Sequence, residues 1–303
     1  MDNVNKISVA IPFYNNTAFL EDCLRIPLLD PRVDDIVISD DCSRDEEWEV
    51  FNGLLKGWSQ GALFNLDSCT RTRDIFSDMT AVDLSENMWK VRVERNDQNM
   101  LGFRNKVIAV SKAKNDWVYL LDSDNYFTEQ TLPCLYDFVD WDPAVCYIPN
   151  MATMERTHDG NGDLGPSWDD WNYRRFGYSK IDLKMMKQFI NESLRRKPNF
   201  GLDGLLNNGN FLVHKETYLA AVADGFHNPN FKPQAACSIA QIYLFYRAGL
   251  SLQIVPGLTY YHRLHKNSFC ETHGQNLGNY SLQLKHEILS LEDSDLDRGI
   301  GQC

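Results

Sequence analysis

Two aspartates separated by one residue, Asp122 and Asp124, are the clearest candidates for chemistry in this sequence. They follow the run Trp117-Val-Tyr-Leu-Leu, whose apolar composition is typical of a buried strand. Two carboxylates at the end of a strand can point into one crevice, where oxygen ligands suit Mg²⁺ or Mn²⁺ bound together with a diphosphate. The alternative is a plain acidic turn, because Asp-x-Asp often occurs by chance. Neighbouring motifs are therefore needed to decide between a metal-binding turn and a plain acidic turn.

Two earlier apolar runs end in polar residues that could share an edge with Asp122. One run ends in Pro12-Phe-Tyr-Asn15 and the other in Ser39-Asp-Asp-Cys-Ser43. In a parallel sheet, the carboxyl ends of such strands open onto the edge where α/β folds bind ligands. An aspartate there can accept hydrogen bonds from a nucleotide base, and an asparagine or serine can contact ribose. Capping of the following helix is the structural alternative for Asp41 and Ser43, and it is compatible with ligand contact.

The composition indicates a folded, acidic protein. Of the 303 residues 43% are hydrophobic and 24% are charged, and the formal net charge is −12. This charge repels nucleic acid phosphates, so we expect no nucleic acid partner. An anionic diphosphate could still bind if a divalent cation and local Arg or Lys residues reverse the field. The eight cysteines include no Cys-x-x-Cys pair, so the sequence does not indicate a zinc ribbon or finger.

Nothing in the sequence predicts a membrane segment or a secretory signal. The first residues, MDNVNKISVAIPFY, have no basic segment followed by a sustained apolar one. The longest weakly charged stretch, Pro233 to Tyr261, is interrupted by Arg247, Gly249 and Pro256-Gly257. We therefore expect a cytoplasmic protein.

Strand and helix patterns alternate in the first half of the chain, which predicts βαβ units and a mostly parallel sheet flanked by helices. We expect one domain with a first half at 1–125, a second half at 126–268 and a helical or loop extension at 269–303. The role of 58–88 is not readable. The predicted strands are Ile7–Pro12, Asp35–Ser39, Lys90–Glu94, Trp117–Leu121, Ala144–Pro149, Asn210–His214 and Ser251–Val255. The predicted helices are Thr17–Ile26, ended by Pro27, Asp45–Lys56, ended by Gly57, Phe103–Lys114, Thr128–Val139, Asp182–Lys197, Lys215–Ala223 and Ala235–Ala248.

Three motifs in order, IPFYN, VISDDCSRD and GFRNKVIAVSKAKNDWVYLLDSDN, resemble the family-2 group of GT-A glycosyltransferases. The resemblance spans roughly residues 7–125. It implies a GT-A, Rossmann-like α/β fold and transfer of a sugar from a nucleotide-diphosphate sugar, with UDP as one donor nucleotide, to a glycan or other hydroxyl acceptor. It also implies Mn²⁺ or Mg²⁺ as cofactor.

The resemblance assigns roles residue by residue. The expected nucleotide-binding residues are Pro12, Tyr14, Asn15, Asp40, Asp41, Arg104 and Asp122, and the metal would lie at Asp122 and Asp124. The structural alternative for Arg104 is a surface charge on a helix. Cys42 departs from the pattern, because similar sequences usually carry glycine there. Asn125 replaces a frequent acidic residue, but neither change removes a metal ligand.

The second half matches the family pattern less well. Asn208 and Gly209 resemble a loop that borders the donor sugar, with a plain turn as the alternative. Inverting members carry a Glu-Asp pair on a later helix, with the Asp as general base, but Ala240 and Gln241 stand at these positions. Glutamine cannot take a proton. The remaining candidates for a base are Asp203, Asp224 and Asp169 or Asp170, unless the alignment slips or catalysis follows another course.

A basic segment near the end of the chain resembles the family's R-x-H-x-x-S pattern. It implies His265 as a metal ligand, with His262 second. Diphosphate contacts would come from Arg263, Lys266 and Ser268. The alternative is a solvated basic turn. Because Pro256-Gly257 predicts a turn and 260–268 has no helical periodicity, we expect this segment to be a mobile cover over the donor.

The sequence leaves other functions open. A sugar nucleotidyltransferase would need a Gly-rich loop with Arg and Lys after the first strand, and Phe13-Tyr-Asn-Asn does not provide one. A catalytically idle nucleotide-sugar-binding protein is compatible with Gln241. A dinucleotide oxidoreductase is disfavoured, because no G-x-G-x-x-G follows the first strand. The sugar, the base, the acceptor, the stereochemical outcome and the oligomeric state are not readable.

Overall fold

The fold was analysed in a computed structural model of the whole chain. It describes residues 6–62, 84–138, 140–156, 171–173, 176–195, 202, 205–206, 208–231, 233, 237–264 and 269–292. Statements below about what the structure contains refer to these residues.

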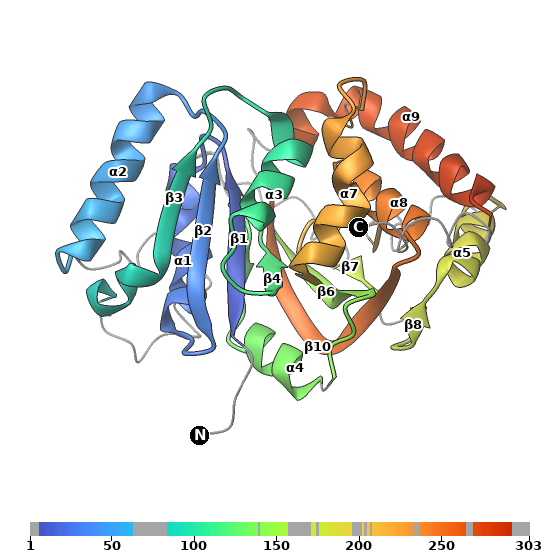
Figure 1. Cartoon of the computed structure of the whole chain (residues 1–303), viewed down its shortest axis with the longest axis horizontal. Coiled ribbons are helices and arrows are strands. Elements are labelled where there is room, and N and C mark those ends of the chain that lie inside the picture. Colours follow the sequence, from blue (N-terminus) through green and yellow to red (C-terminus); the bar gives the residue numbers. More distant parts are fainter. Residues whose placement is uncertain are drawn as a thin grey trace.

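The described strands form one mixed sheet in the order β3-β2-β1-β4-β9-β6-β10-β5, with β7 paired to β6 and β8 paired to β10 (Figure 1). The strands are β1 (Ile7–Phe13), β2 (Val33–Asp40), β3 (Val91–Arg95), β4 (Trp117–Leu120), β5 (Tyr126–Phe127), β6 (Val145–Arg156), β7 (Trp171–Asn172), β8 (Lys180–Ile181), β9 (Phe211–His214) and β10 (Ser251–Leu264). The β1–β2, β1–β4, β2–β3 and β6–β10 pairs are parallel, and β9 is antiparallel to both β4 and β6.

Helices cover both faces of this sheet. The helices are α1 (Leu20–Leu29), α2 (Asp45–Ser59), α3 (Leu101–Ser111), α4 (Thr131–Asp137), α5 (Leu183–Arg195), α7 (Lys215–His227), α8 (Cys237–Arg247) and α9 (Phe269–Ser290), with short 3-10 turns η1 (Thr17–Phe19) and η3 (Ser85–Lys90). Apolar residues of α1, α2 and α4 share one buried cluster with β1 and β2. Those of α3, α5, α7, α8 and α9 share a second cluster against β4, β6 and β10. The sheet is therefore the middle of three layers.

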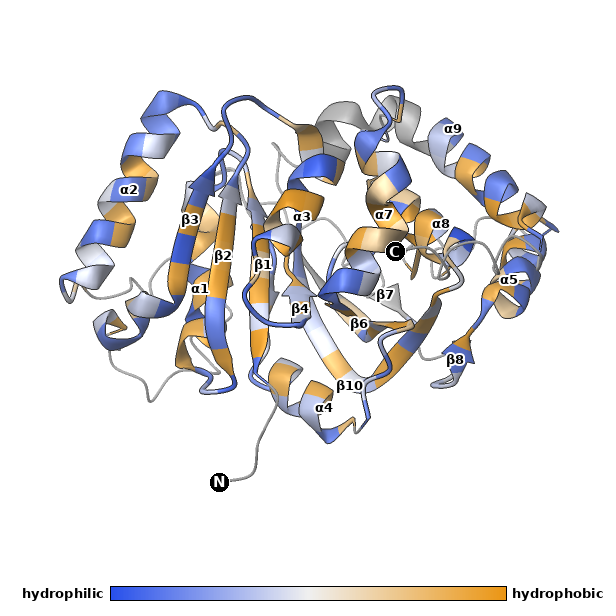
Figure 2. Ribbon diagram, viewed as in Figure 1, coloured by the Kyte–Doolittle hydropathy of each residue, from blue (hydrophilic) through white to orange (hydrophobic). Residues whose placement is uncertain are grey.

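Side-chain alternation in β1 explains how two clusters form on one strand. Ile7, Val9, Ile11 and Phe13 face the cluster of α1 and α2, whereas Ala10 faces the cluster of α3. Both sides of the strand are buried, as expected for a parallel strand between two helical layers. Figure 2 shows the resulting apolar colouring of the central strands beside helices of mixed colour. Burial on both faces fixes β1 at the centre of the N-terminal half.

The antiparallel strand β9 decides which loops meet at the carboxyl edge of the sheet. β4 runs toward this edge and ends at Leu120, where it pairs with Phe211, the first residue of β9. The Asp-Ser-Asp turn after β4 and the 208–210 segment before β9 therefore lie side by side. The carboxyl ends of β1 and β2 reach the same edge, because β1 is parallel to β4 and β2 is parallel to β1.

Several boundaries differ from the sequence prediction. α1 continues past Pro27 to Leu29, and Pro27 costs little there because it sits in the last turn, where only one helical bond is lost. α2 continues past Gly57 to Ser59, since one glycine weakens a helix by about 1 kcal/mol without ending it. β6 is longer than predicted.

The largest difference lies in β10, where we predicted a turn followed by a mobile cover. The strand instead runs from Ser251 to Leu264, with an irregularity between Val255 and Thr259, and pairs with β6 on both sides of it. Residues 259–264 are therefore part of the sheet. The sequence pattern failed because Pro256-Gly257 was taken as the end of a strand, whereas Gly257 only bulges it at a φ of 77°.

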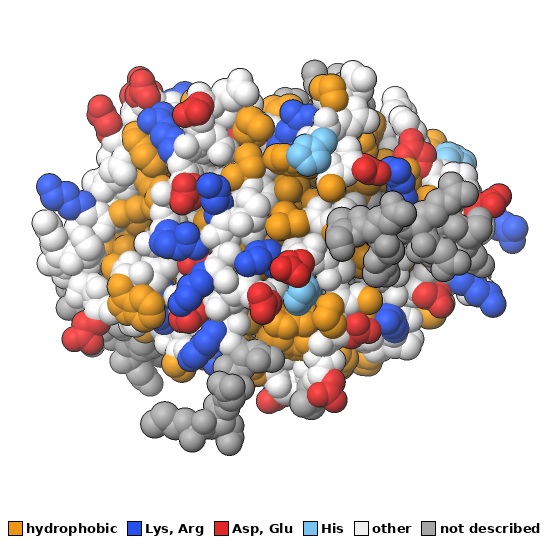
Figure 3. All heavy atoms as spheres, in the orientation of Figure 1, with side chains coloured by type: hydrophobic (Ala, Val, Ile, Leu, Met, Phe, Trp, Pro, Cys, Tyr) orange, Lys and Arg blue, Asp and Glu red, His pale blue; other side chains and the backbone are white. Residues whose placement is uncertain are grey.

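The C-terminal residues form α9, which packs against α5 and α8. No described helix combines the length and the apolar composition that a bilayer span requires. On the face shown in Figure 3, Lys and Arg side chains lie interspersed among Asp and Glu side chains, which matches the mixed charge of the sequence.

Candidate functional site at the carboxyl edge of the sheet

Asp40 holds together the turn that follows β2. Its side chain is fully buried and accepts hydrogen bonds from the Ser43 backbone N and hydroxyl, and Arg95 Nε lies 3.3 Å from Asp40 Oδ2. Burial raises the pKa of Asp40 above its ordinary value, and the Ser43 bonds and Arg95 oppose that rise. The carboxylate is thus occupied by the protein itself, and it is not accessible to the nucleotide base that the sequence suggested.

Asp41 connects the same turn to the start of α3. Asp41 Oδ1 accepts hydrogen bonds from the backbone N of Met100 at 2.7 Å and from Asn96 Nδ2 at 3.1 Å. Burial raises the pKa of Asp41, and these donors lower it. They also hold the strained entry to α3, where Leu101 has a φ of 67°. Asp41 therefore positions the N-terminus of α3 at the edge of the site.

The loop after β1 meets the loop after β2 through Asn15. Its backbone N donates to Ser43 Oγ and its Oδ1 accepts from the Arg44 backbone N, both at 2.9 Å. Asn15 has a φ of 50°, a conformation that asparagine tolerates better than most residues. Tyr14 beside it is 45% exposed, so its ring is accessible, and Pro12 is half-buried in β1 opposite Ser39.

Asn105 is a residue that the sequence analysis missed. Its Nδ2 donates to the carbonyl oxygens of Ser39 at 2.9 Å and Phe13 at 3.4 Å, and its Oδ1 accepts from Ser39 Oγ at 2.7 Å. One buried amide thus links the ends of β1 and β2 to α3. The motif contains Asn105, but no pattern in the sequence indicates these partners. Arg104, its neighbour, is half-buried and donates to the Asn228 carbonyl at 3.1 Å.

Asp122 is paired with a lysine that the sequence analysis also missed. Lys106 Nζ lies 2.6 Å from Asp122 Oδ1, and the two side chains are 6% and 24% exposed. Burial raises the pKa of Asp122, Lys106 opposes this rise, and Asp124 adds to it. The signal for Lys106 was available, because it shares a helical face with the apolar Phe103 and Val110 at i+3 and i+4 spacing.

The segment 208–210 closes over this ion pair. Asn210 Oδ1 accepts a hydrogen bond from the Asp122 backbone N at 2.8 Å, and Asn208 Oδ1 accepts from the Asn210 backbone N at 3.1 Å. A Cβ on Gly209 would lie 2.7 Å from Lys106 Nζ and would collide with Asp122 Oδ2. The absence of a side chain at Gly209 is therefore what allows this close approach. Asn208 and Gly209 thus lie at Asp122, and their contact with the donor sugar stays a prediction.

The Asp-Ser-Asp turn is tied down on its other side as well. Asn16 Nδ2 donates to Ser123 Oγ at 2.9 Å, and the Arg263 backbone N donates to Asn125 Oδ1 at 3.1 Å. The Arg263 guanidinium is 2% exposed, lies 2.8 Å from Asp22 Oδ2 and stacks on the Phe19 and Tyr126 rings. Arg263 therefore supports the turn from beneath, in contrast to the diphosphate contact suggested by the sequence.

Metal-binding chemistry at this edge rests on few side chains. Within the described residues, no three His, Cys, Asp or Glu side chains gather into a ready-made metal centre. Asp122 and Asp124 supply carboxylate oxygens, and His262 is close enough to lower the pKa of Asp122. Such a set fits a hard cation that takes most of its ligands from a phosphate and from water.

One candidate for the general base, Asp224, lies elsewhere, and Gln241 occupies the position where similar sequences carry the base. Gln241 is fully buried in α8, and its Nε2 donates to the Tyr218 hydroxyl at 2.8 Å. Asp224 is 75% exposed and pairs with Arg247 at 2.9 Å. Arg247 ends α8, about 15 Å along the helix from Cys237, whose thiol is close enough to raise the pKa of Lys106. Asp224, which pairs with Arg247 at the far end of α8, is therefore not brought to Asp122.

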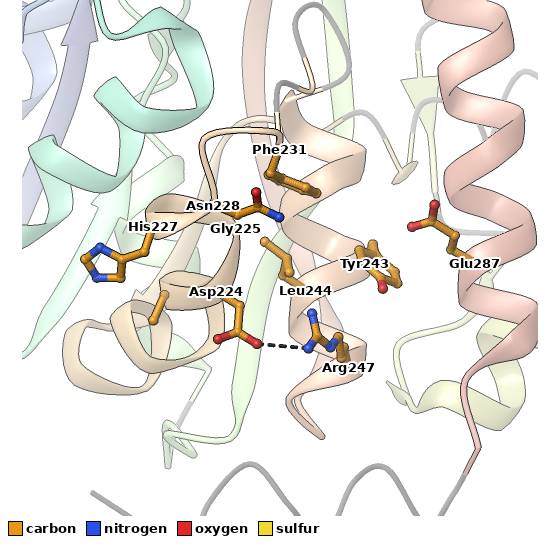
Figure 4. A pocket seen from close by; sticks show the side chains of 10 residues that line it. Asp224, Gly225, His227, Asn228, Phe231, Tyr243, Leu244, Arg247 and Glu287 are labelled. Carbon is orange, nitrogen blue, oxygen red and sulfur yellow. Dashed lines mark hydrogen bonds and ion pairs between the residues drawn. The ribbon is translucent and has the colours of Figure 1, made fainter.

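The Asp224–Arg247 pair belongs to a separate pocket of about 570 Å³, in which Tyr243 and Glu287 project from α8 and α9 (Figure 4). Its Arg247 end lies a helix length from the aspartates, and we do not assign it to the same site. Six further candidates fall outside the described residues: Asp169, Asp170, Asp203, His265, Lys266 and Ser268.

Comparisons with known proteins agree with this geometry. Residues 8–191 match the model of glycosyl transferase family 2. The structure of S. aureus TarS 1–349 in complex with UDP-GlcNAc is similar, with a TM-score of 0.56, 15% identity, and coverage of 96% of this chain and 69% of that chain. GalNAc-T7 with UDP, GalNAc and Mn²⁺ has a TM-score of 0.51 and 18% identity, covering 87% and 45%. No curated protein sequence matches significantly.

At these identities the structural matches establish the fold, and they confirm the expected GT-A architecture. The family match spans more than half of the 303 residues and includes the ends of β1 and β2 and the Asp-Ser-Asp turn. The chain therefore belongs to glycosyl transferase family 2.

Proposed function

We propose that this glycosyltransferase moves a sugar from a nucleoside-diphosphate sugar to an acceptor hydroxyl with the help of Mn²⁺ or Mg²⁺. One observation carries the proposal: the turn with Asp122 and Asp124, the 208–210 segment and the ends of β1 and β2 converge at one edge of the sheet. UDP is our first choice of nucleotide, because the similar TarS and GalNAc-T7 structures contain UDP-GlcNAc and UDP.

The residues divide into those that bind and those that position. Pro12, Tyr14 and Asn15 line the base and ribose, and the exposed Tyr14 ring offers a stacking surface. Asp41 and Asn105 fix the loops around them. Asn208 and Gly209 border the donor sugar, because they lie against Asp122. Arg104 lies in the first turn of α3, and its guanidinium donates to the Asn228 carbonyl.

Asp124 is the proposed carboxylate ligand of the cation, and Asp122 faces the donor beside it. When bound, the cation would neutralise the negative charge that develops on the departing diphosphate. The protein itself supplies a fixed arrangement of donors around that charge, since the turn is tied to β9, β10 and the loop after β1. Such preorganisation requires no rearrangement during the reaction.

A second candidate function is donor binding without transfer. It is favoured by Gln241, which stands where similar sequences carry the base and is buried against Tyr218. Asp203 remains a proposed base. A hydroxyl acceptor must otherwise lose its proton to another group within hydrogen-bond reach.

A calorimetric screen of UDP, GDP, dTDP and their sugars, with Mn²⁺ and with EDTA, tests the proposed function. A donor held at a hundred times its Kd should stabilise the fold by about 2.7 kcal/mol. We expect one nucleotide to bind at least about tenfold more tightly with Mn²⁺. Equal affinity in EDTA would remove the metal from the account, and no binding of any nucleotide would contradict the proposal.

Turnover separates the two candidate functions. The tight-binding donor is incubated with Mn²⁺ and a panel of glycan acceptors, and release of the nucleoside diphosphate is followed. Release that depends on the acceptor supports transfer. Tight donor binding without any release of the nucleoside diphosphate, either by transfer to an acceptor or by hydrolysis, supports a binding protein that does not catalyse transfer.

A further inference from the structure

Lys106 is a buried cation on the otherwise apolar face of α3. Its side chain is 6% exposed, and its Nζ lies 2.6 Å from Asp122 Oδ1. A lysine is almost never fully buried unless it has a partner of opposite charge. At this distance the two side chains form an ammonium–carboxylate ion pair.

The ion pair is enclosed on several sides. Gly209 lies so close that even a methyl group there would touch both Lys106 and Asp122. The Asp122 backbone is held by Asn210 Oδ1 at 2.8 Å. Cys237 Sγ packs beside Gly102, 3.8 Å from where a Cβ would lie. The lysine thus has a fixed place behind the aspartates.

The charges around this place balance in a specific way. Asp122 has its counter-ion in Lys106, and Asp22 has its counter-ions in Arg25 and Arg263. Asp124 also interacts electrostatically with Lys106. A cation entering the site would therefore meet Asp122 with its charge already balanced by an internal ammonium.

We propose that Lys106 is a positioning residue that acts as a built-in counter-cation: it holds Asp122 away from the divalent cation and supplies positive charge to the donor's diphosphate. The inference rests on the proposed function for the identity of the donor. With Lys106 in this role, part of the affinity for the nucleotide does not depend on the divalent cation. The affinity of the nucleotide-free protein for the cation is kept low.

The test measures two equilibria in Lys106→Met, which keeps the length and apolar stem of the side chain and removes its charge. Mn²⁺ binding to the protein without nucleotide is followed by electron paramagnetic resonance, and UDP binding in EDTA by calorimetry. We expect the Mn²⁺ affinity to rise about tenfold or more and the metal-free UDP affinity to fall by a similar factor. Lys112→Met, a change at an exposed lysine just after α3, is the matched control and should leave both unchanged.

A rise in Mn²⁺ affinity together with a fall in metal-free UDP affinity would show that Lys106 acts through its charge. A purely structural role for Lys106 would make both affinities fall, and an Mn²⁺ affinity equal to that of the wild type would overturn the inference. If Lys106→Met does not fold, Lys106→Gln decides, because it retains a hydrogen-bond donor toward Asp122 without the charge. Should the wild type bind no nucleoside diphosphate, the proposed function fails, while the Mn²⁺ measurement still decides the role of Lys106.

Discussion

Two acidic sequences lie at the carboxyl ends of β2 and β4, the strands on either side of β1, yet the protein uses them differently. Asp40 and Asp41 after β2 are 0% and 3% exposed and accept hydrogen bonds from Ser43, Asn96 and Met100. Asp122 after β4 is 24% exposed and pairs with Lys106 at 2.6 Å. The first pair is a framework, and the second faces outward.

The difference shows that an acidic pair at a strand end does not by itself identify a ligand site. What separates the two is the supply of internal donors. The turn after β2 bends back so that the Ser43 backbone N–H reaches the Asp40 carboxylate, whereas in the turn after β4 it is the Asp122 backbone N–H, and not the carboxylate, that bonds to Asn210. The predictions below test this division, from the largest expected effect to the smallest.

Asp124→Asn should reduce transfer by about 10²–10³-fold, because an amide oxygen is a much weaker ligand for a divalent cation than a carboxylate. Thermal unfolding should change little, since a ligand carboxylate contributes little packing. Nucleoside diphosphate release under saturating donor and Mn²⁺ is the measurement. The control is Asp97→Asn at an exposed position in the loop after β3. A folded Asp124→Asn enzyme of full activity would remove Asp124 from the site.

Asp40→Ala should lower the free energy of unfolding by about 2–4 kcal/mol, because it strands the buried Ser43 donors. Urea denaturation measures this. Asp45→Ala is the matched control: Asp45 contacts the same Arg95 at 3.2 Å but is 90% exposed, so its loss should matter little. Equal losses of unfolding free energy in the two variants would mean that the burial of Asp40 does not make it more important for stability than the exposed Asp45.

Glu21 extends the comparison to a third acidic pair, Glu21-Asp22 in α1. Asp22 has two arginine partners, whereas Glu21 Oε1 is buried and makes no hydrogen bond within the described residues. Burial raises the pKa of Glu21 to about 7. Because the folded state holds this proton more tightly than the unfolded state, the stabilisation is complete below the ordinary pKa of 4.5 and is lost as the pH rises through about 7.

Wild type and Glu21→Gln should therefore differ in how their stability changes with pH. We expect the free energy of unfolding of the wild type to fall by about 1–3 kcal/mol relative to the variant between pH 4.5 and pH 8. Urea denaturation at several pH values gives the difference. Parallel curves would show that Glu21 is solvated in solution.

Cys42→Gly should give the smallest effect, a gain in the free energy of unfolding of about 0.5–1 kcal/mol. Cys42 has a φ of 60°, a left-handed conformation that glycine adopts without strain. The greater freedom of glycine in the unfolded chain offsets part of this gain. Cys42→Ala keeps the strain and should show no increase. A gain with alanine as well would mean that the thiol, and not the backbone, is responsible.

The N-terminal half was predictable because its signals are local. Each strand end is written as an apolar run followed by polar residues, and parallel pairing then places Asn15, Asp41 and Asp122 at one edge. Lys106 carried a local signal too, a lysine on an apolar helix face. Its partner could not be read, because Asp122 is brought to it only by the packing of α3 beside β4.

The second half was less predictable because its contacts are long-range. The pairing of β10 with β6 joins residues about a hundred positions apart and overrides the local turn signal of Pro256-Gly257. The same holds for Arg263, whose partner Asp22 is 241 residues away. The local sequence around a basic residue looks the same whether that residue binds a phosphate or pairs with a distant carboxylate of the same chain.

The bulge in β10 inserts an even number of residues. Val255 pairs with Pro149 and Thr259 with Met151, so β10 advances four residues while β6 advances two. Even parity keeps the alternation of the strand in phase across the bulge, with His262 near Asp122 and Arg263 against Asp22. Deleting Pro256 alone would exchange these two faces and bury His262 where the guanidinium now lies, whereas deleting Pro256 and Gly257 together would preserve them. Whether the bulge inserts an even or an odd number of residues thus determines on which face of the sheet each of these basic side chains lies.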